Sequence, residues 1–384
     1  MPKKISFLIE SLEGGGSEKV FKNLTNYISY NTNIIIEIIL VKKKGIFLKD
    51  LNKNIKIIDL KSSRTLFAFL PLVKYLRKTN SDVIISTLSH MNILLTFSNL
   101  FTFNKNKIII RESSTPSVLI NEVYDSLIFK KLFKFFLFFF YKIQKTIICP
   151  SEGVANDLEN SFKVKRDKIK VISNPINFEE IDNSKNIIIK ENFFKSTSKM
   201  IISIGRLDKY KNHIDLLEVF IQIYKKYDIK LSLFGNGPEK KNLENYIKKN
   251  SLSNYVKIFN FDENPYKFLY KSHIFVSTSL FEGFPNSLLE AVCMGKICIS
   301  YDCDSGPKEI FEDDINPSLA MHGGSAEVLS IHGDNDSLTV NINFQGNCDG
   351  CGSAENGTLI GIQEFLKESL DIPEVSVVNK QKRL

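Results

Sequence analysis

The chain has 384 residues, of which 43% are hydrophobic and 24% charged, and its formal net charge is +8. This composition excludes a disordered chain, a collagen-like repeat and a small disulfide scaffold, and the length predicts two or three domains. The charge is unevenly divided, with +14 on residues 1–313 and −6 on residues 314–384. We interpret this change as a boundary between two unrelated modules.

The beginning of the sequence contains no visible secretory signal. Its first apolar run, residues 5–9, is too short for one and predicts a buried strand instead. The most apolar run, residues 132–141, is interrupted by Lys134 and has about half of the roughly 20 residues that a membrane-spanning helix needs. We therefore expect a cytoplasmic protein with reduced cysteines.

Short β-branched runs alternate with helical stretches along most of the chain. A first series of predicted strands precedes a turn-rich segment at 173–177, and a second series follows it. The predicted strands are 5–9, 34–41, 55–60, 83–87, 107–111 and 146–150, then 200–204, 230–234, 256–259, 274–277 and 297–301. Nearly continuous apolar strands with intervening helices predict parallel sheets that are covered on both faces. We expect an α/β fold with two Rossmann-like domains and ligands beyond the carboxyl ends of the strands.

The first motif, residues 13–18 (EGGGSE), lies between the first strand and a helix that we expect to begin near Glu18. Glycines allow a ligand to approach the backbone closely, and a helix N-terminus offers free N–H groups to a phosphate. The motif is not GxGxxG, and a tight strand-to-helix turn is an equally good interpretation.

Residues 129–145 carry five lysines around a phenylalanine-rich core. A basic amphipathic segment of this kind predicts contact with an anionic membrane surface, beside a lipid-linked acceptor. A buried helix with solvated lysines is the alternative.

Two further motifs follow strands of the second series. Arg206 and Lys211 lie in residues 204–213 (IGRLDKYKNH), where both could reach one diphosphate, arginine through its planar fork and lysine as a point charge. The turn 234–239 (FGNGPE) has the same placement. Solvated surface charge remains the alternative for each motif taken singly.

Residues 282–290 (EGFPNSLLE) predict a loop that enters a helix near Ser287. Glu290 lies about one turn into this helix and could accept hydrogen bonds from paired hydroxyls, such as those of a ribose. Two carboxylates opposite a basic diphosphate site suit a nucleotide-sugar better than a nucleic acid, for which no basic-aromatic stacking motif is present. A capped helix with two exposed glutamates is the alternative.

Residues 1 to about 312 resemble the GT-B retaining glycosyltransferases of family four. The matching pieces, in order, are the loop 14–16 with Glu18, Ser89–Met91, Arg111–Glu112, Pro150–Gly153, Asn174–Pro175, Gly205–Arg206 with Lys211, Gly235–Gly237, the Glu282/Glu290 pair and Gly306–Glu309. The resemblance implies a GT-B pair of Rossmann-like domains, with an acceptor-side domain at 1–175 and a nucleotide-sugar-binding domain at 176–312.

This resemblance implies transfer of a sugar from an NDP-sugar, a UDP-hexose or UDP-HexNAc, to a glycan or lipid-linked acceptor in surface-polysaccharide biosynthesis. It implies retention of anomeric configuration and no divalent metal for the transfer. The implied catalytic residues are His90, Glu282, Arg206 and Lys211. The implied donor-binding residues are Gly14, Gly15, Gly16, Gly205, Arg206, Lys211, Gly283, Phe284 and Glu290, with Glu290 on the ribose.

The acidic end contains a CxxC pair, Cys348 and Cys351, on a glycine-rich turn. Spacing alone leaves a redox dithiol, half of a shared metal site and a structural pair open. The other cysteines match no ligand pattern, and we expect them to be packing residues: Cys149, Cys293, Cys298 and Cys303.

Around this pair, the HGG at 322–324, the TLIGI at 358–362 and the PEV at 373–375 make residues 313–384 similar to the small α/β NifU-like C-terminal domain. That resemblance implies a homodimer in which Cys348 and Cys351 of each chain hold one bridging [4Fe–4S] cluster. The alternative function is then an iron–sulfur scaffold or carrier that supplies apo iron–sulfur proteins.

The glycosyltransferase family normally continues beyond residues 306–309 with a further strand and C-terminal helices, which this chain replaces with the acidic module. We therefore expect a truncated second domain with impaired closure. A genuine fusion, a frame-shifted or recombined gene and a chimera remain open, and in the alternative function the transferase part is an inactive remnant.

Overall fold

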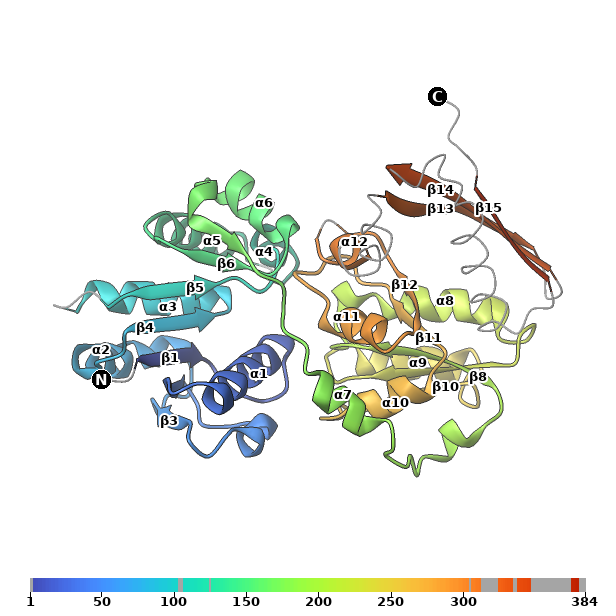
Figure 1. Ribbon diagram of the computed structural model, residues 1–384, viewed down its shortest axis with the longest axis horizontal. Coiled ribbons are helices and arrows are strands. Elements are labelled where there is room, and N and C mark those ends of the chain that lie inside the picture. The colour runs from blue at the N-terminus through green and yellow to red at the C-terminus, as the bar shows by residue number, and fades with distance from the viewer. Residues whose placement is uncertain are drawn as a thin grey trace. The chain divides into compact units, whose positions relative to one another are not determined.

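The computed structural model describes residues 3–102, 106–123, 126–303, 305–311, 324–333, 337–346 and 374–379. The chain divides into two compact units, one of residues 1–294 and 298–307 and the other of residues 295–297 and 308–384. The first unit contains two sheets with their helices, so the expected α/β fold with two parallel-sheet Rossmann-like domains is confirmed (Figure 1).

The first sheet has seven parallel strands in the order β3-β2-β1-β4-β5-β6-β7. The strands are β1 (Lys4–Ile9), β2 (Ile35–Leu40), β3 (Lys56–Asp59), β4 (Val83–Thr87), β5 (Ile108–Arg111), β6 (Ile147–Cys149) and β7 (Ile169–Val171). The helices are α1 (Gly16–Asn31), α2 (Phe69–Lys78), α3 (Ser89–Leu100), α4 (Pro116–Val123), α5 (Leu127–Lys142) and α6 (Glu152–Phe162), with 3-10 turns η1 (Ile46–Asp50), η2 (Thr65–Ala68) and η3 (Arg166–Lys168). The sequence predicted every strand except β7, whose residues Ile169–Val171 are interrupted by a lysine and give no continuous apolar run.

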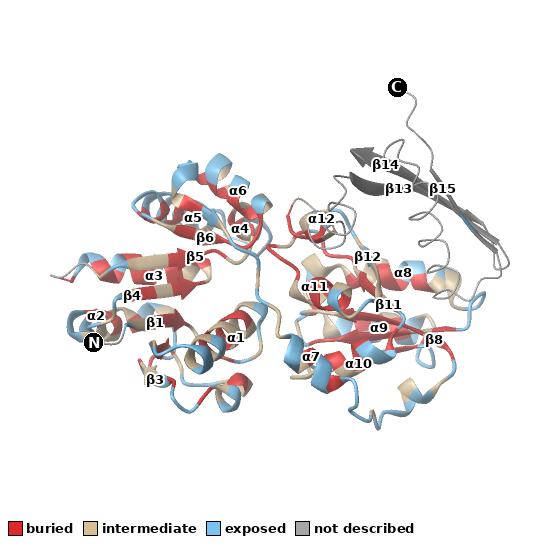
Figure 2. Ribbon diagram, viewed as in Figure 1, coloured by how far each residue is buried: buried red, intermediate tan, exposed pale blue. Residues whose placement is uncertain are grey.

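Both faces of this sheet are covered, as the near-continuous apolar strands predicted. Successive side chains of a strand point to opposite faces. Phe7 and Ile9 pack with Phe21 of α1 in one buried cluster, whereas Leu8 packs with Leu72 of α2 and Leu95 of α3 in another. Figure 2 shows the resulting concentration of buried residues along the strands.

The second sheet has five strands in the order β10-β9-β8-β11-β12. Its strands are β8 (Lys199–Ile204), β9 (Ile229–Phe234), β10 (Val256–Phe259), β11 (Ile274–Ser277) and β12 (Ile297–Ser300). The remaining elements of this part are α7 (Phe178–Ser184), η4 (Asn192–Lys195), η5 (Lys209–Lys211), α8 (His213–Ile223), α9 (Lys240–Lys249), α10 (Tyr266–Lys271) and α11 (Asn286–Cys293). One face packs Leu231 and Leu233 against α8 and α9, while Phe234 stacks on Phe259 at 4.6 Å and contacts Phe268 of α10 at 4.5 Å between ring centres.

In the second unit, three strands follow the short helix α12 (Pro307–Ile310). They are β13 (Gly324–Gly333), β14 (Ser337–Gly346) and β15 (Glu374–Asn379). β14 pairs antiparallel with β13 and parallel with β15. The helix expected at 358–370 lies outside the described residues.

The described cysteines only partly follow the expectation that they are packing residues. Cys149 is fully buried, as expected, but Cys293 at the end of α11 is exposed, so its assignment as a packing residue was wrong. Cys298 and Cys303 are intermediate. A cysteine with no ligand pattern is usually buried, but the last residue of a surface helix can face solvent whatever its type.

No helix in the described part of the chain is both long and apolar enough to cross a membrane.

Candidate functional site

The carboxyl ends of β8 and β11 bring Lys211 and Glu282 together, two residues that are 71 positions apart. Their side chains form an ion pair and are only 17% and 11% exposed. Thr278 donates its hydroxyl proton to the Lys211 carbonyl at 3.0 Å, and the ring of Tyr210 lies 4.9 Å from that of Phe281. These contacts fix a cation and a carboxylate side by side at the ligand-binding edge of the second sheet.

Gly205 and Arg206 precede this pair in the same loop. A Cβ at Gly205 would meet the Lys211 Cε at 3.5 Å, so the backbone here lies directly beside the lysine stem. The Arg206 side chain is 69% exposed, and its Nε lies 2.9 Å from Asp208 Oδ2. The loop thus presents the exposed guanidinium of Arg206 and the partly buried ammonium of Lys211.

The loop after β11 accepts hydrogen bonds from residues that belong to the half of the unit with the first sheet. Ser151 donates to the Gly283 carbonyl at 2.7 Å, and Thr115 donates to the Glu282 carbonyl at 2.9 Å. Gly283 has no space for a side chain, because a Cβ would lie 2.2 Å from the Ser113 carbonyl oxygen. Within the described residues, the amides of Gly283 and Phe284 donate no hydrogen bond, so both can serve a ligand.

Glu290 is buried in α11 and already accepts two hydrogen bonds. Lys19 of α1 approaches its Oε1 at 2.7 Å, and the Tyr266 hydroxyl donates to the same oxygen at 3.2 Å. The Lys19 ammonium also lies 4.5 Å from the centre of the Tyr266 ring. Burial, followed by the nearby Glu290 charge, raises the pKa of Tyr266 well above its usual value. The carboxylate expected to hold a ribose is therefore paired with a lysine from the other half of the unit.

The amides of the glycine loop are hydrogen-bonded to a side chain of the helix that follows the loop. Glu18 Oε2 accepts hydrogen bonds from the amides of Gly14 at 2.7 Å and Gly15 at 3.2 Å, and α1 begins at Gly16, two residues earlier than expected. Burial raises the pKa of Glu18, although the two amide hydrogen bonds oppose this shift. Two of the amides that the motif offers to a phosphate thus bind a carboxylate in this structure.

A chain of polar contacts connects this loop with α11 and β5. Arg111 donates to Asn174 Oδ1 at 2.5 Å, Asn174 donates to Asn286 Oδ1 at 2.7 Å, and Asn286 donates to the Gly16 carbonyl at 3.4 Å. Burial lowers the pKa of Arg111 to about 10. This polar chain therefore joins the end of β5, the first residue of α11 and the glycine loop.

His90 lies at the start of α3, after Leu88, whose φ is +78°. Its Nε2 is 3.2 Å from Glu10 Oε2, and the other Glu10 oxygen pairs with Lys42 at 3.0 Å. The hydrogen bond with His90 is the main reason that the pKa of Glu10 falls to about 2. Glu10 thus remains a carboxylate that orients the imidazole at any physiological pH.

Behind His90, the start of α3 is anchored to a buried carboxylate. Ser89 donates to both oxygens of Glu112 at 3.0 Å, and Tyr141 donates to the same group. Burial raises the pKa of Glu112. This network holds the helix turn that carries His90.

The predicted site residues therefore form three contact groups: Lys211 with Glu282 and Gly205, Glu290 with the helix of the glycine loop, and His90 with Glu10. Sequence reasoning missed Glu10, Lys19, Tyr266 and Asn286. Glu10 directly follows β1, and the rule that ligands lie beyond strand ends could have identified it. No sequence motif marks Lys19 or Tyr266, because their role depends on contacts with Glu290, which is distant in sequence.

Cys348 and Cys351 lie outside the described residues, as does the turn that carries them. Among the residues that are described, no group of three or more His, Cys, Asp or Glu side chains is arranged to hold a metal ion.

Three family models match the chain. Glycosyltransferase Family 4 matches residues 49–180, Glycosyl transferases group 1 matches residues 184–330, and the NifU-like domain matches residues 308–379. The last two matches overlap at 308–330.

Curated relatives and solved structures agree with the first two models. The N-acetylgalactosamine-N,N'-diacetylbacillosaminyl-diphospho-undecaprenol 4-alpha-N-acetylgalactosaminyltransferase of Campylobacter jejuni is 30% identical over 323 residues, which cover 81% of this chain and 84% of the relative. The amylovoran biosynthesis glycosyltransferase AmsD of Erwinia amylovora is 26% identical, with coverages of 81% and 84%. The structure of HepE from Anabaena with UDP and glucose superposes with a TM-score of 0.65 at 15% identity, covering 78% of this chain and 81% of HepE.

Proposed function

The chain belongs to the glycosyltransferases of group 1 and family 4 with the GT-B fold, and from this premise we propose that it transfers a sugar from a UDP-hexose or UDP-HexNAc to a glycan or lipid-linked acceptor with retention of anomeric configuration. The bond from the anomeric carbon to the diphosphate breaks, a new bond forms to the acceptor oxygen, and the acceptor hydroxyl loses its proton. The products are UDP and the glycoside.

The single observation that carries this proposal is the partly buried Lys211–Glu282 pair next to the unengaged amides of Gly283 and Phe284. The leaving diphosphate gains negative charge as the bond to the sugar breaks. Fixed cations and N–H groups that face it stabilise this charge, and they do so most strongly where water is excluded. Lys211 would then exchange its contact with Glu282 for one with the diphosphate, Arg206 would add its exposed fork, and Glu282 would be released to the sugar.

Two further roles complete the donor and acceptor sides. Glu290 would exchange the Lys19 ammonium for the ribose hydroxyls, and the Gly14–Gly16 loop with Gly205 would line the diphosphate and acceptor. His90, oriented by Glu10, would lie near the reacting centre. The uridine assignment is supported by HepE, whose structure contains UDP, and the lipid-linked acceptor by the diphospho-undecaprenol named for the Campylobacter relative.

Release of UDP from a panel of UDP-hexoses and UDP-HexNAcs, with and without acceptor, tests the proposal directly. Lys211→Ala should lower kcat by about a hundredfold or more, because it removes a group that acts on the leaving diphosphate. Lys248→Ala, at an exposed lysine of α9 in the same half of the unit, is the matched control and should be neutral. Absence of UDP-sugar binding by the unaltered protein would refute the transferase proposal, and normal turnover would refute the expected impairment of closure.

The anomeric outcome needs its own measurement. The coupling constant of the anomeric proton in the purified product, compared with that of the donor, distinguishes retention from inversion. An inverted product would contradict retention while leaving the donor site intact.

A second candidate function concerns the acidic module. The NifU-like family match over residues 308–379 favours an iron–sulfur scaffold or carrier, with Cys348 and Cys351 as the thiolates. Two cysteines supply half of the four thiolates that a [4Fe–4S] cluster takes, so this proposal includes a homodimer with the cluster as cargo.

We also propose peripheral membrane contact. The helix α5 contains most of the basic, phenylalanine-rich segment 129–145, and eight of its large apolar side chains are exposed: Leu127, Ile128, Phe129, Leu132, Phe135, Phe136, Phe138 and Phe139. A buried helix would not leave these residues at the surface, so the membrane interpretation is the better supported of the two alternatives.

A further inference from the structure

Three buried hydroxyl groups contact the backbone of the loop after β11, and the transfer proposed above gives none of them a role. Thr115 and Ser151 belong to the half of the unit with the first sheet, and Ser305 follows β12. They are only 6%, 1% and 3% exposed. We call these three residues the loop hydroxyls. Because buried hydroxyls are normally hydrogen-bonded, their partners indicate what they do.

The loop hydroxyls donate to two successive carbonyl groups. Thr115 donates to the Glu282 carbonyl at 2.9 Å, and Ser305 donates to the same oxygen. The hydroxyl oxygens of Thr115 and Ser305 lie 3.0 Å apart, so both face one acceptor. Ser151 donates to the next carbonyl, that of Gly283, at 2.7 Å.

A carbonyl that is fixed in this way also fixes the direction of the amide that follows it. The peptide bonds 282–283 and 283–284 are both trans. In a planar trans peptide the C=O and N–H bonds point in opposite directions. The Glu282 carbonyl therefore sets the direction of the Gly283 N–H, and the Gly283 carbonyl sets that of the Phe284 N–H. A hydrogen bond to the carbonyl also polarises the peptide and strengthens its N–H as a donor.

The loop depends on such outside contacts for the direction of its N–H groups. Gly283 has no Cβ, so local sterics leave the peptide planes on both sides of it free to rotate. Pro285 comes after Phe284 and has no N–H, and α11 begins at Asn286. The amides of Gly283 and Phe284 are therefore the two that this stretch offers to a ligand before the helix begins.

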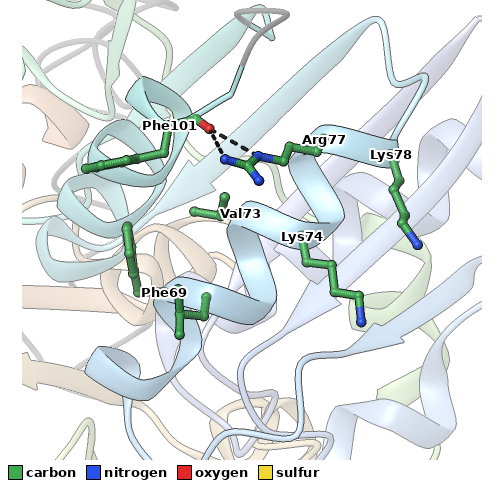
Figure 3. Close-up of a pocket in the computed structure, with 7 residues that line it drawn as sticks. Phe69, Val73, Lys74, Arg77, Lys78 and Phe101 are labelled. Atoms are coloured by element: carbon green, nitrogen blue, oxygen red, sulfur yellow. Dashed lines mark hydrogen bonds between the residues drawn. The ribbon is translucent and has the colours of Figure 1, made fainter.

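The loop hydroxyls do not line either of the two hollows found on the described part of the unit. A hollow of about 390 Å³ on α2, which Figure 3 shows, is lined by residues such as Phe69, Val73 and Arg77. Another of about 310 Å³ lies around residues 185–189. The described residues that line these hollows include no loop hydroxyl, so we assign these groups to the loop backbone and not to a ligand in either hollow.

We propose that the loop hydroxyls are positioning residues, which orient the amides of Gly283 and Phe284 toward the leaving diphosphate. The Phe284 amide is oriented through Ser151, a residue of the half with the first sheet. That half therefore takes part in donor recognition as well as in acceptor binding. The inference rests on the proposed function, because it adds a direction to two amides of the same site.

The sequence makes the Phe284 amide directly observable by NMR. Residues 283–284 are the only Gly-Phe step in the chain, so isotope labels on glycine carbonyl carbon and phenylalanine nitrogen give one doubly labelled amide signal. Saturating UDP should move this amide proton downfield in the unaltered protein as a hydrogen bond to phosphate forms. Ser151→Ala should reduce the shift by at least about half, because hydrogen bonds weaken steeply when their angle departs from linear.

A matched control is needed because Ser151 also caps α6, where its oxygen accepts from the Val154 amide at 3.3 Å. Asn177→Ala removes an equivalent cap from α7, where Asn177 Oδ1 accepts from the Glu180 amide at 3.0 Å. This control should retain the full shift. A full shift in Ser151→Ala, or equal reductions in both variants, would overturn the proposal.

The other carbonyl is tested by kinetics of UDP release. Thr115→Val/Ser305→Ala removes both hydroxyls from the Glu282 carbonyl and should lower kcat by about tenfold, while KM for the UDP-sugar changes by less than about twofold. The reason for this difference is that the diphosphate carries most charge in the transition state. Thr115→Ser retains a hydroxyl and should retain kcat. An unchanged kcat in the double variant, or an equal loss in Thr115→Ser, would contradict the assignment.

Failure of this inference differs from failure of the proposed function. If calorimetric titration shows that UDP binds the unaltered protein while the Phe284 amide does not move, the inference is wrong and the transferase proposal stands. If the amide moves but no UDP-sugar is turned over, the transferase proposal is wrong, and the oriented amides still bind UDP.

Discussion

His213, the first residue of α8, is only 4% exposed, and its Nδ1 has no hydrogen-bond partner among the residues that the structure describes. Burial, followed by the positive charge of Lys211, lowers its pKa from 6.5 to about 4. An imidazole held neutral in this way makes the protein sensitive to acid, because the unfolded chain takes up a proton at a higher pH than the folded one.

We predict that His213→Phe flattens the acid dependence of stability. The contribution of His213 is fully present above pH 6.5 and is lost as the pH falls towards about 4, which amounts to about 3 kcal/mol over this range. Urea unfolding of both proteins at several pH values between these limits measures the difference. A slope equally steep in His213→Phe would contradict the prediction.

At this scale the sequence identified residues better than it identified their partners. Lys211, Glu282 and Glu290 were found from their motifs, since strand ends and helix starts place such groups at the ligand edge. That Lys211 pairs with Glu282, and Glu290 with Lys19, depends on side-chain packing between segments 71 and 271 residues apart. Local patterns contain no information about contacts at this range.

Among the elements, α1 depends on Glu18 for its N-terminus. The helix has no side-chain cap at Gly15, and the Glu18 carboxylate satisfies the amides of Gly14 and Gly15 instead. We predict that Glu18→Ala lowers the free energy of unfolding by about 1 kcal/mol, the usual value of such a cap. Glu18→Gln retains an acceptor oxygen and should lose less. Equal losses, measured by urea unfolding, would show that the amides are not the relevant partners.

The helices α1 and α11 meet through Lys19 and Glu290, and the donor should compete with this ion pair. We predict that Glu290→Gln weakens UDP-sugar binding by about tenfold, because a hydrogen bond to a charged group contributes about 1.5–3 kcal/mol. Calorimetric titration measures the effect. A donor lacking the ribose 2′-hydroxyl is the control: its affinity should change much less, and an equal change for both donors would remove Glu290 from the ribose site.

The elements themselves followed from apolar patterning with small errors at their ends. Val83–Thr87, Val256–Phe259 and Ile274–Ser277 coincide with predicted strands, because each is a mainly apolar run between polar turns. β7 was missed because Lys170 interrupts its apolar run. The helix α1 begins early because Glu18 caps the glycine loop, which the pattern alone does not indicate.

For the whole molecule, the change in charge near residue 313 lies close to Lys308, where the second compact unit continues, and within residues 308–330, where the group 1 and NifU-like matches overlap. We predict that Cys348→Ala/Cys351→Ala abolishes the cluster absorbance formed on anaerobic reconstitution and leaves UDP release unchanged. The first effect follows because thiolates are the cluster ligands, and the second because these residues lie outside the transferase motifs. Absorbance that persists in the double variant would refute the carrier function, and a parallel loss of UDP release would show that the modules are functionally coupled.

The sequence also indicated the two sheets of the first unit and their shared ligand edge. It did not indicate that Ser151 and Thr115 donate hydrogen bonds to the loop after β11. The acceptors are backbone carbonyls, which every residue type has, so the sequence does not distinguish them.

The close approach at Gly283 has a consequence for how this protein tolerates substitution. A Cβ there would meet the Ser113 carbonyl oxygen at 2.2 Å, and one at Gly235 would meet the Gly205 carbonyl oxygen at 1.9 Å. At Gly205 and Gly15 the nearest neighbours are the flexible side chains of Lys211 and Glu18, at 3.5 and 3.4 Å. In a library that varies every position, the first two glycines should be nearly invariant because of the protein's own backbone, and the last two should admit alanine. Intolerance at Gly283 or Gly235 would therefore report the close approach of two backbone segments, and would not by itself identify a substrate contact.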